Sequence, residues 1–351
     1  MNTAHAQAAA TQGRHPPESD FVLRGHYRVQ GARRAGAGSL QGWWLRGEPD
    51  LLDDVQINAA LAAHPAWQGA FFCTLRAARV SQRQGEFADR PDILYKRSHF
   101  VPAAESAPMP CNIVDVDKSL HLWHQRLPYV HAWFGAPALA QAQALLGDIR
   151  TTIANEYFLH EAGHALGYDV ERKTVQNYFC PGGQAAAMLI ALEELRADLH
   201  AFGLALTLLP AQRAAAIFVY NLMLRLGVHL QGMHQTGRAP YGLIPYLLFA
   251  ALQRLGLQGA VSGRCLSVPA ILEAMHRCAV HALEAITGPQ AHAADPIAAA
   301  MGDAHYVRAL LLDSRLTAAF DAQVQAALAR LTPSLLTHRQ DGALSYAPQA
   351  D

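Results

Sequence analysis

Charged residues are scarce in this chain of 351 residues: they make up 16% of it, whereas hydrophobic residues make up 51%. So little charge excludes a largely disordered protein, because disordered chains are rich in charge and poor in apolar side chains. The 28 basic and 28 acidic residues cancel, and no basic block of the kind that binds a phosphate backbone is present. We therefore do not expect nucleic acid as a partner.

Cysteine is also rare. The five cysteines are odd in number and widely spaced, which argues against a disulfide framework and favours a reducing compartment. The first 20 residues lack a basic segment followed by an apolar one, so we expect no secretory signal. The longest apolar stretches, such as 239–253, are interpreted as too short to span a membrane. These absences predict a soluble, cytoplasmic protein without a membrane partner.

The N-terminal third predicts a small β-containing part. Residues 1–20 are polar and Ala-rich and are predicted to be a disordered tail. A β-containing part is predicted over 21–117, where short runs of aromatic and branched residues are bounded by Gly, Pro and Asp. The predicted strands are 21–29, 40–45, 70–80 and 93–101, and one helix is predicted at 51–63.

The rest of the chain predicts helices. Residues 118–335 are predicted to form a helical, metal-binding catalytic domain, and 336–351 a C-terminal tail. Apolar residues recur with a helical period in segments 137–166, 184–209, 211–231, 240–256, 268–287 and 304–331. The predicted fold class is therefore α+β, with a mainly helical part after a smaller β-containing part.

Residues 160–164 read HEAGH, which is an HExxH motif. Positions i and i+4 of a helix share a face, so His160 and His164 can bind one metal ion while Glu161 reaches a water molecule on that metal. The helix is predicted to begin after Asp148, which can cap it, and to end before Gly167. Zinc is the expected metal, with one ion per chain and Glu161 as the catalytic base.

A catalytic zinc ion usually has a third protein ligand. The longer pattern HExxHxxGxxH would place a histidine at position 170, but Val170 cannot bind a metal. Further along, Glu194 and Asp198 lie four residues apart in an otherwise apolar helical segment. Glu194 as ligand, with Asp198 accepting from a ligand histidine, would explain both acids. The alternative is a solvated helix face on which Arg196 pairs with the acids.

This combination of motifs resembles the gluzincin metallopeptidases, which carry HExxH on one helix and a glutamate ligand on a second. The sequence EELRAD at 193–198 is similar to the second motif of the dipeptidyl peptidase III family, although the first motif of that family has one residue more. The resemblance covers residues 148–210. It implies a zincin-like helical site in which Glu194 is the ligand and Asp198 pairs with His160, or failing that with His164.

Three further side chains are candidates for stabilising an oxyanion. His229 follows Gly and Val, and a GVH sequence is similar to the context of the oxyanion-stabilising histidine of thermolysin-like gluzincins. His234 lies close behind it, and Tyr178 lies in the linker between the two predicted metal helices. An ordinary histidine at the end of a helix is the alternative for His229.

These features predict a zinc-dependent hydrolase that cleaves a peptide or other amide bond. Two alternatives stay open. The first is a metal-dependent biosynthetic enzyme that acts on a small molecule, with iron or manganese as possible metals, and the second is a non-catalytic regulatory protein that binds a metal. The expected partner is a peptide or a small-molecule substrate, and the oligomeric state is open.

Overall fold

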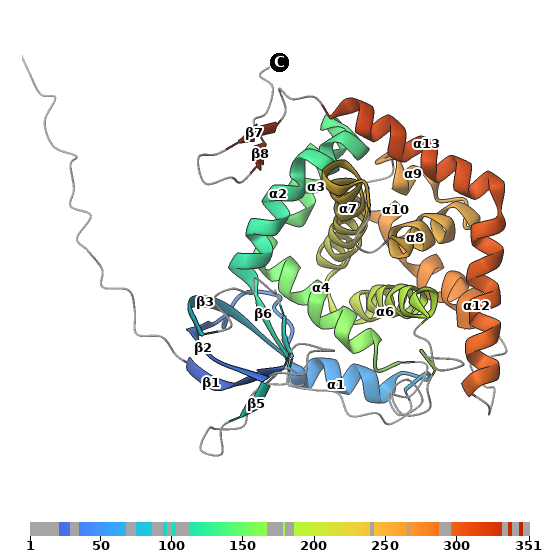
Figure 1. Cartoon of the computed structure of the whole chain (residues 1–351). Helices are drawn as coiled ribbons and strands as arrows, with labels where there is room; N and C mark the ends of the chain where they lie inside the picture. Colours follow the sequence, from blue (N-terminus) through green and yellow to red (C-terminus); the bar gives the residue numbers. More distant parts are fainter. Residues whose placement is uncertain are drawn as a thin grey trace, which may run out of the picture.

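The computed structural model describes residues 21–28, 35–67, 75–85, 94–96, 100–102, 112–166, 178–179, 186–238, 242–264, 267–287, 296–331, 336–338 and 344–346. The tail predicted at 1–20 and the predicted helix stop at Gly167 lie outside these residues. Within them the chain combines an N-terminal sheet with a larger helical body (Figure 1). The α+β class predicted from the sequence is confirmed.

The sheet has six strands in the order β4-β6-β3-β2-β1-β5. In chain order they are β1 (Phe21–Arg28), β2 (Ala35–Trp44), β3 (Leu75–Gly85), β4 (Leu94–Lys96), β5 (Phe100–Pro102) and β6 (Asn112–Asp115). Neighbouring strands are antiparallel, except that β3 and β6 are parallel. Helix α1 (Asp54–Ala63) connects β2 to β3 and begins with a capping box between Asp53 and Gln56.

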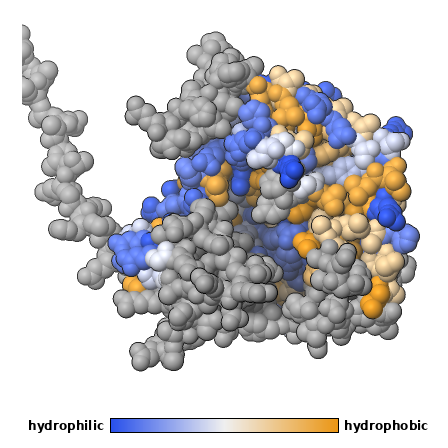
Figure 2. Space-filling model, viewed as in Figure 1, coloured by the Kyte–Doolittle hydropathy of each residue, from blue (hydrophilic) through white to orange (hydrophobic). Residues whose placement is uncertain are grey.

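The helical body follows directly on β6. Its elements are α2 (Val116–Phe134), α3 (Ala136–Leu146), α4 (Ile149–Gly163), α6 (Ala187–Leu208), α7 (Ala211–Thr236), α8 (Leu243–Arg254), α9 (Gln258–Val261), α10 (Val268–Arg277), the π-helical turn η3 (Cys278–Ala282), α11 (Leu283–Thr287), α12 (Pro296–Leu312) and α13 (Ser314–Arg330). A short antiparallel pair, β7 (Leu336–His338) and β8 (Leu344–Tyr346), comes last. On the face shown in Figure 2, hydrophilic residues gather over α2 and apolar residues over α12.

Asp115 joins the sheet to the helices. It is the last residue of β6, and its carboxylate accepts from the backbone N–H of Lys118 in the first turn of α2. The same carboxylate forms an ion pair with Arg83 of β3. Because Asp115 is 1% exposed, these contacts fix the direction in which the chain enters the helical body.

Helix α4 lies at the centre of the body, between α1, α2, α6 and α7 (Figure 1). Every side chain from Thr151 to His160 is buried. Asn155 donates its side-chain amide to the carbonyl of Asp50 at 2.7 Å, and its side-chain oxygen accepts from the backbone N–H of Leu52 at 2.9 Å. The segment that leads into α1 is thereby attached to α4, and a buried polar residue is satisfied.

Several predicted boundaries are wrong, and the causes are local. The helix predicted over 137–166 breaks at Gly147, whose φ of 57° interrupts the ladder before Asp148 caps α4. The helix predicted over 304–331 breaks at Asp313, which caps α13. Helix α2 was not among the predicted segments, and Pro128 lies inside it. In the described part of the predicted run 93–101, Leu94–Lys96 forms β4, and Phe100 and Val101 belong to β5; of the predicted run 70–80, residues 70–74 lie outside the described residues and 75–80 belong to β3.

Helix α7 also corrects the sequence analysis. With 26 residues it is long and apolar enough to cross a membrane, which no segment was expected to be. However, 78% of its most apolar window is buried inside the protein. Such burial is typical of a core helix, so its apolar character is explained by packing against α2, α3, α4 and α10.

Gly163 allows α4 and α6 to approach closely at the end that carries the HExxH motif. A Cβ atom at this position would lie 2.4 Å from the carbonyl oxygen of Ala197 in α6 and 2.9 Å from its Cα. These atoms belong to the backbone and cannot rotate away. The spacing of the two helices therefore requires a residue without a side chain at position 163.

We expect Gly163→Ala to push α4 and α6 apart and to destabilise the protein by about 1–3 kcal/mol, the usual penalty for overpacking. Gly203→Ala, in α6, is the matched control, because its Cβ would lie 3.4 Å from the Cβ of Ala279, an ordinary contact. Because alanine favours a helix more than glycine does, we expect the control to lose no stability and to gain at most about 1 kcal/mol in free energy of unfolding. Urea unfolding measures both; equal stabilities for the two variants would contradict the close approach.

Candidate metal centre

The HExxH motif occupies the C-terminal end of α4. Asp148 caps this helix, as predicted, by accepting from the backbone N–H groups of Arg150 and Thr151, each at 3.2 Å. The regular helix ends at Gly163, three residues before the predicted end, but His164 keeps helical angles of φ −64° and ψ −21°. His160 and His164 therefore share one face, with ring centroids 4.7 Å apart.

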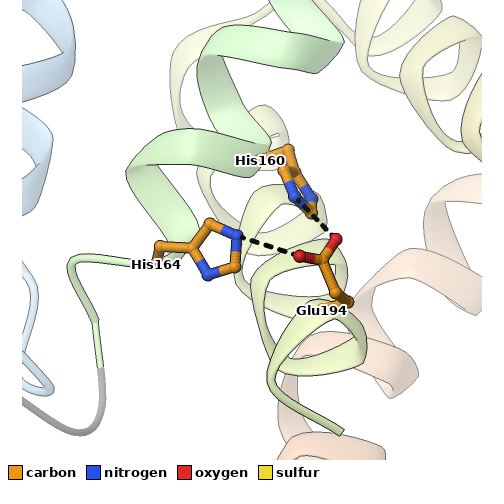
Figure 3. Close-up of side chains that lie close together, drawn as sticks. All are labelled: His160, His164 and Glu194. Carbon is orange, nitrogen blue, oxygen red and sulfur yellow. Dashed lines mark ion pairs between the residues drawn. The ribbon is translucent and has the colours of Figure 1, made fainter. Parts of the chain in front are cut away.

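Glu194 of α6 faces both histidines (Figure 3). Its Oε2 lies 3.3 Å from Nε2 of His160, and its Oε1 lies 3.8 Å from Nε2 of His164. One donor atom from each of the three residues lies within 4.8 Å of the others. Two adjacent helices thus bring together the three residues that the sequence analysis selected as ligands.

The spacing of these donors can be compared with that of a tetrahedral zinc ion. With bonds of about 2.0–2.2 Å, two ligand atoms of such an ion are separated by about 3.3–3.6 Å. The two nitrogen–oxygen distances, 3.3 Å and 3.8 Å, lie at or near this range but involve different oxygens of Glu194, and one donor atom from each residue lies within 4.8 Å of the others. Two imidazoles and one carboxylate are also a donor set that catalytic zinc sites use, with the fourth position left for water or substrate.

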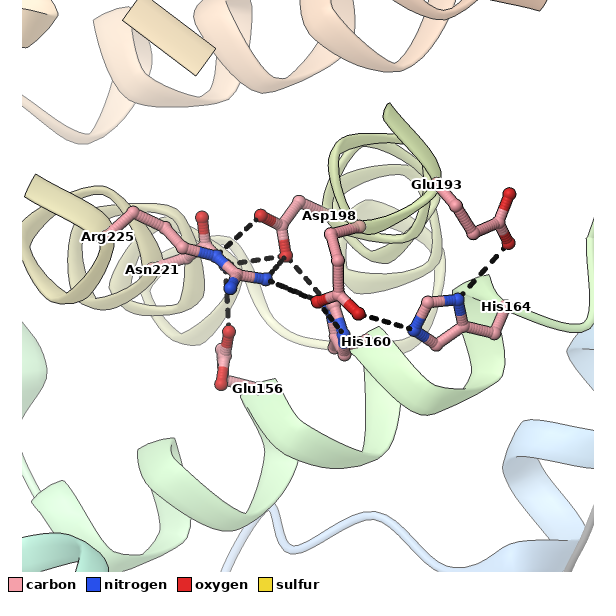
Figure 4. A network of polar contacts seen from close by, with 8 residues as sticks. Glu156, His160, His164, Glu193, Asp198, Asn221 and Arg225 are labelled. Atoms are coloured by element: carbon pink, nitrogen blue, oxygen red, sulfur yellow. Dashed lines mark hydrogen bonds and ion pairs between the residues drawn. The ribbon is translucent and has the colours of Figure 1, made fainter. Parts of the chain in front are cut away.

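Both histidines are oriented by a second carboxylate (Figure 4). Nδ1 of His160 lies 2.8 Å from Oδ1 of Asp198, which is the pair expected from the sequence. Nδ1 of His164 lies 3.2 Å from Oε1 of Glu193, a contact that the sequence analysis did not predict. An imidazole that donates Nδ1–H to a carboxylate keeps the lone pair of Nε2 for a metal, and both Nε2 atoms face Glu194.

Asp198 is itself held by α7. It is completely buried, and Arg225 donates to both of its oxygens, from Nε at 2.9 Å and from Nη2 at 2.8 Å. Asn221 donates its amide to Asp198 at 3.0 Å and to Glu156 of α4 at 2.8 Å. This network connects α4, α6 and α7 behind the candidate ligands.

Burial and charge act against each other on these groups. Burial lowers the pKa of His160, but its contacts with Asp198 and Glu194 outweigh burial and raise that pKa to about 10. Burial raises the pKa of Glu194 and of Asp198, yet His160 and Arg225 hold both pKa values below the usual range. Both carboxylates are therefore anionic at neutral pH, the state in which a carboxylate binds a cation, whereas His160 without an ion is protonated and must release its Nε2 proton before an ion binds there.

The alternative of a solvated acidic face on α6 is wrong, because Glu193, Arg196 and Asp198 are 5%, 2% and 0% exposed. Arg196 pairs instead with Asp303 of α12, at 2.8 Å, and donates to the hydroxyl of Tyr178 at 2.8 Å. The Tyr178 hydroxyl donates in turn to Asp303. Arg196 also lies 3.9 Å from Glu193, so a buried polar chain runs from α12 to His164.

A cavity of about 290 Å³ lies beside the candidate ligands. His160, Glu161 and Glu194 form part of its wall, so Glu161 lines the same space as two of the three candidate ligands, whereas His164 is not among the lining residues. The remaining lining residues come from β6, α2, α4, α7 and α8: Val114, Ser119, Arg126, Ile153, Glu156, Tyr157, Tyr220, Leu224, Arg225, Val228 and Pro245.

The three candidate oxyanion stabilisers do not line this cavity among the described residues. Tyr178 is 1% exposed, and its hydroxyl is occupied by Arg196 and Asp303. His229 packs against Phe320 of α13, with ring centroids 5.0 Å apart. His234 lies near the C-terminal end of α7, where its Nδ1 contacts the Tyr129 hydroxyl at 3.3 Å. Their positions give no support to the predicted role.

Arg225, Asn221 and Glu156 belong to the site but were not selected from the sequence. Arg225 and Asn221 are polar residues in an otherwise apolar part of α7, the same signal that singled out Glu194 and Asp198 in α6. Glu156 precedes His160 by one helical turn and so shares its face. The sequence thus held a signal for each of these three residues. Only the folded structure shows that α7 packs behind Asp198.

Comparison with protein-family models, with curated proteins and with solved structures finds no match. The chemistry of the site is therefore inferred from its donor atoms, their spacing and their surroundings.

We expect Asp198→Asn to weaken zinc binding about 10- to 100-fold, because the amide fits the same space but no longer holds His160 as a carboxylate does. Glu193→Gln is the matched change at His164 and should act in the same direction, more weakly because its contact is longer, 3.2 Å against 2.8 Å. Zinc titration against a competing chelator measures both. Wild-type affinity in a folded Asp198→Asn protein would show that Asp198 does not support a metal ligand.

His229 gives a prediction on acid stability. Burial lowers the pKa of its imidazole from 6.5 to about 4, and the nearby Asp321 only partly opposes this. The unfolded chain therefore takes up a proton on this residue more readily than the folded protein does. Its contribution to stability is complete above pH 6.5 and is lost as the pH falls from 6.5 to about 4.

In His229→Leu this loss should disappear. Between pH 7.5 and pH 5 the wild type should lose about 2 kcal/mol more free energy of unfolding than the variant, since one pKa unit corresponds to 1.36 kcal/mol. Urea unfolding at the two pH values measures the difference, and the other titrating groups cancel because both proteins contain them. Parallel pH dependence in the two proteins would contradict a neutral, buried His229.

Proposed function

We propose that the protein is a zinc-dependent hydrolase of the gluzincin type that cleaves a peptide or other amide bond. The observation that carries this proposal is a cluster of three potential metal-binding residues, two of which, His160 and Glu194, line one cavity together with a separate carboxylate, Glu161. His160, His164 and Glu194 would hold the ion, and Glu161 faces the same cavity without being one of the three donors. A purely structural metal site has no use for that fourth group.

When bound, zinc polarises a carbonyl group and makes water acidic enough to attack it near neutral pH. The residues of the chain supply the rest. Glu161 accepts the proton of the attacking water on a carboxylate oxygen and delivers it to the leaving amine. Asp198 and Glu193 keep the two imidazoles in the tautomer that presents Nε2 to the ion.

Arg225 stabilises the anionic form of both carboxylates that face His160. Its guanidinium binds Asp198 through two donors and lies 3.5 Å from Oε2 of Glu194. Apolar side chains such as Ile153 and Leu224 line the cavity and reduce the access of bulk water, which strengthens these interactions.

A second candidate function is favoured by the size of the cavity. At about 290 Å³ it lies at the small end of the range for ligand pockets. The same centre would then serve a metal-dependent enzyme of small-molecule metabolism, with iron or manganese as alternative metals. In either case α7 is a buried helix, and we infer a soluble protein of the cytoplasm.

The test begins with the metal. We expect the purified protein to contain about one zinc ion per chain, and His160→Ala and His164→Ala to lose it. Glu161→Gln should keep the ion but lose turnover of the dipeptides and N-acyl amino acids that the wild type cleaves, by about 100-fold or more, because an amide cannot accept the proton. Metal analysis and an amine-release assay provide the two measurements.

Full occupancy in either histidine variant would exclude the proposed ligands. A Glu161→Gln protein that turns over substrate at the wild-type rate would exclude Glu161 as the base. A zinc-loaded wild type that cleaves none of these amides would favour the second candidate function.

A further inference from the structure

The cavity beside the candidate ligands limits what can bind there. A volume of about 290 Å³ accommodates a molecule of about dipeptide size, whereas a longer peptide could place only one of its ends inside. The end of a peptide is either an ammonium or a carboxylate group. The charged residues of the wall therefore decide which end is recognised.

Most of these charges have a role in the centre itself. Glu194 is a proposed ligand, Glu161 is the proposed base, and Arg225 is bound to Asp198 and Glu194. Glu156 accepts from Asn221 as part of the network behind His160. Arg126 differs from them because it comes from α2, a helix that contributes none of the proposed ligands.

Packing between α2 and α7 directs Arg126 to the cavity. At Gly227 a Cβ atom would lie 2.9 Å from Cγ2 of Val130 and 3.8 Å from Cβ of Arg126, so the two helices nearly touch at this point. Arg225 and Val228, on either side of Gly227 in α7, line the cavity together with Arg126. Tyr220 also lines the cavity; burial and then the charge of Glu156 raise the pKa of its phenol, and the charge of Arg126 opposes that rise.

We propose that Arg126 forms a carboxylate-binding subsite, and that the substrate is a small amide with a free carboxylate, such as a dipeptide. A guanidinium presents parallel N–H donors that match the two oxygens of a carboxylate. Apolar residues of the same cavity wall, among them Val114 and Val228, weaken competition by water for this ion pair. The inference rests on the proposed function, and it specifies the substrate class.

The experiment measures binding separately from turnover. Zinc-loaded Glu161→Gln is titrated calorimetrically with glycyl-leucine, with glycyl-leucinamide and with N-acetylglycyl-leucine. The amide lacks the carboxylate, and the acetylated dipeptide lacks the ammonium group. We expect amidation to weaken binding about 10- to 100-fold, the strength of a hydrogen-bonded charge, and acetylation to change it less than threefold.

The second arm changes Arg126 in the same Glu161→Gln background. Arg126→Gln should remove the preference for glycyl-leucine over its amide, and Arg126→Lys should retain part of it, because a lysine keeps the charge but loses the paired donors. Lys118→Gln is the matched control, since it also removes one positive charge from α2 but at a position outside the cavity lining. Zinc content and thermal unfolding are recorded for each variant.

Three results would overturn the inference: equal binding of the acid and its amide, a preference that survives Arg126→Gln, or a loss caused by acetylation, which would indicate an ammonium site. If Arg126→Gln does not fold, the comparison of ligands on the parent protein and on Arg126→Lys still decides. Failure of the proposed function has a different signature, because zinc-loaded wild type would then cleave none of the probes even where it binds them.

Discussion

A carboxylate with no exposed surface lies between the three central helices. Asp198 of α6 contacts His160 of α4, and Arg225 and Asn221 of α7, at distances of 2.8–3.0 Å. A buried carboxylate without partners would be strongly destabilising, so these groups must be in place for the helices to pack as they do. The positions of the other polar side chains in the centre follow from this constraint.

Helix α6 carries buried charged side chains on two of its sides. On one side Asp198 faces Arg225, and on the other Arg196 faces Asp303 of α12, so each buried charge meets an opposite one. Glu193 lies between these pairs and contacts His164. Such pairs contribute little net stability, because desolvation offsets their attraction, but removing one partner is destabilising. Their consistent effect is to fix the directions of the histidine rings.

Rigidity of this kind suits a metal centre. A first coordination shell that is held by second contacts needs little reorganisation when an ion binds. The close approach at Gly163 serves the same end, because it sets the distance between the helix that carries the histidines and the helix that carries Glu194. The proposed carboxylate subsite lies on a different helix, α2, which contributes none of the proposed ligands.

The sequence by itself determined the local features. The i and i+4 spacing placed His160 and His164 on one face, Asp148 marked the start of their helix, and the acids of an apolar segment indicated Glu194 and Asp198. Helical periodicity follows from backbone geometry alone, and a charged residue in an apolar helix requires a partner wherever the helix packs. Both rules apply before the fold is known.

Only the tertiary structure decided which residues meet across helices. Arg225 lies 27 residues after Asp198, and Arg126 lies 34 residues before His160, so no local spacing relates either residue to its place in the site. Tyr178 shows the opposite case. Its place between the two metal helices predicted a role in the site, but in the structure its hydroxyl accepts from Arg196. Contacts between distant segments depend on how whole helix faces pack, and that packing is a collective property of the core that short patterns do not contain.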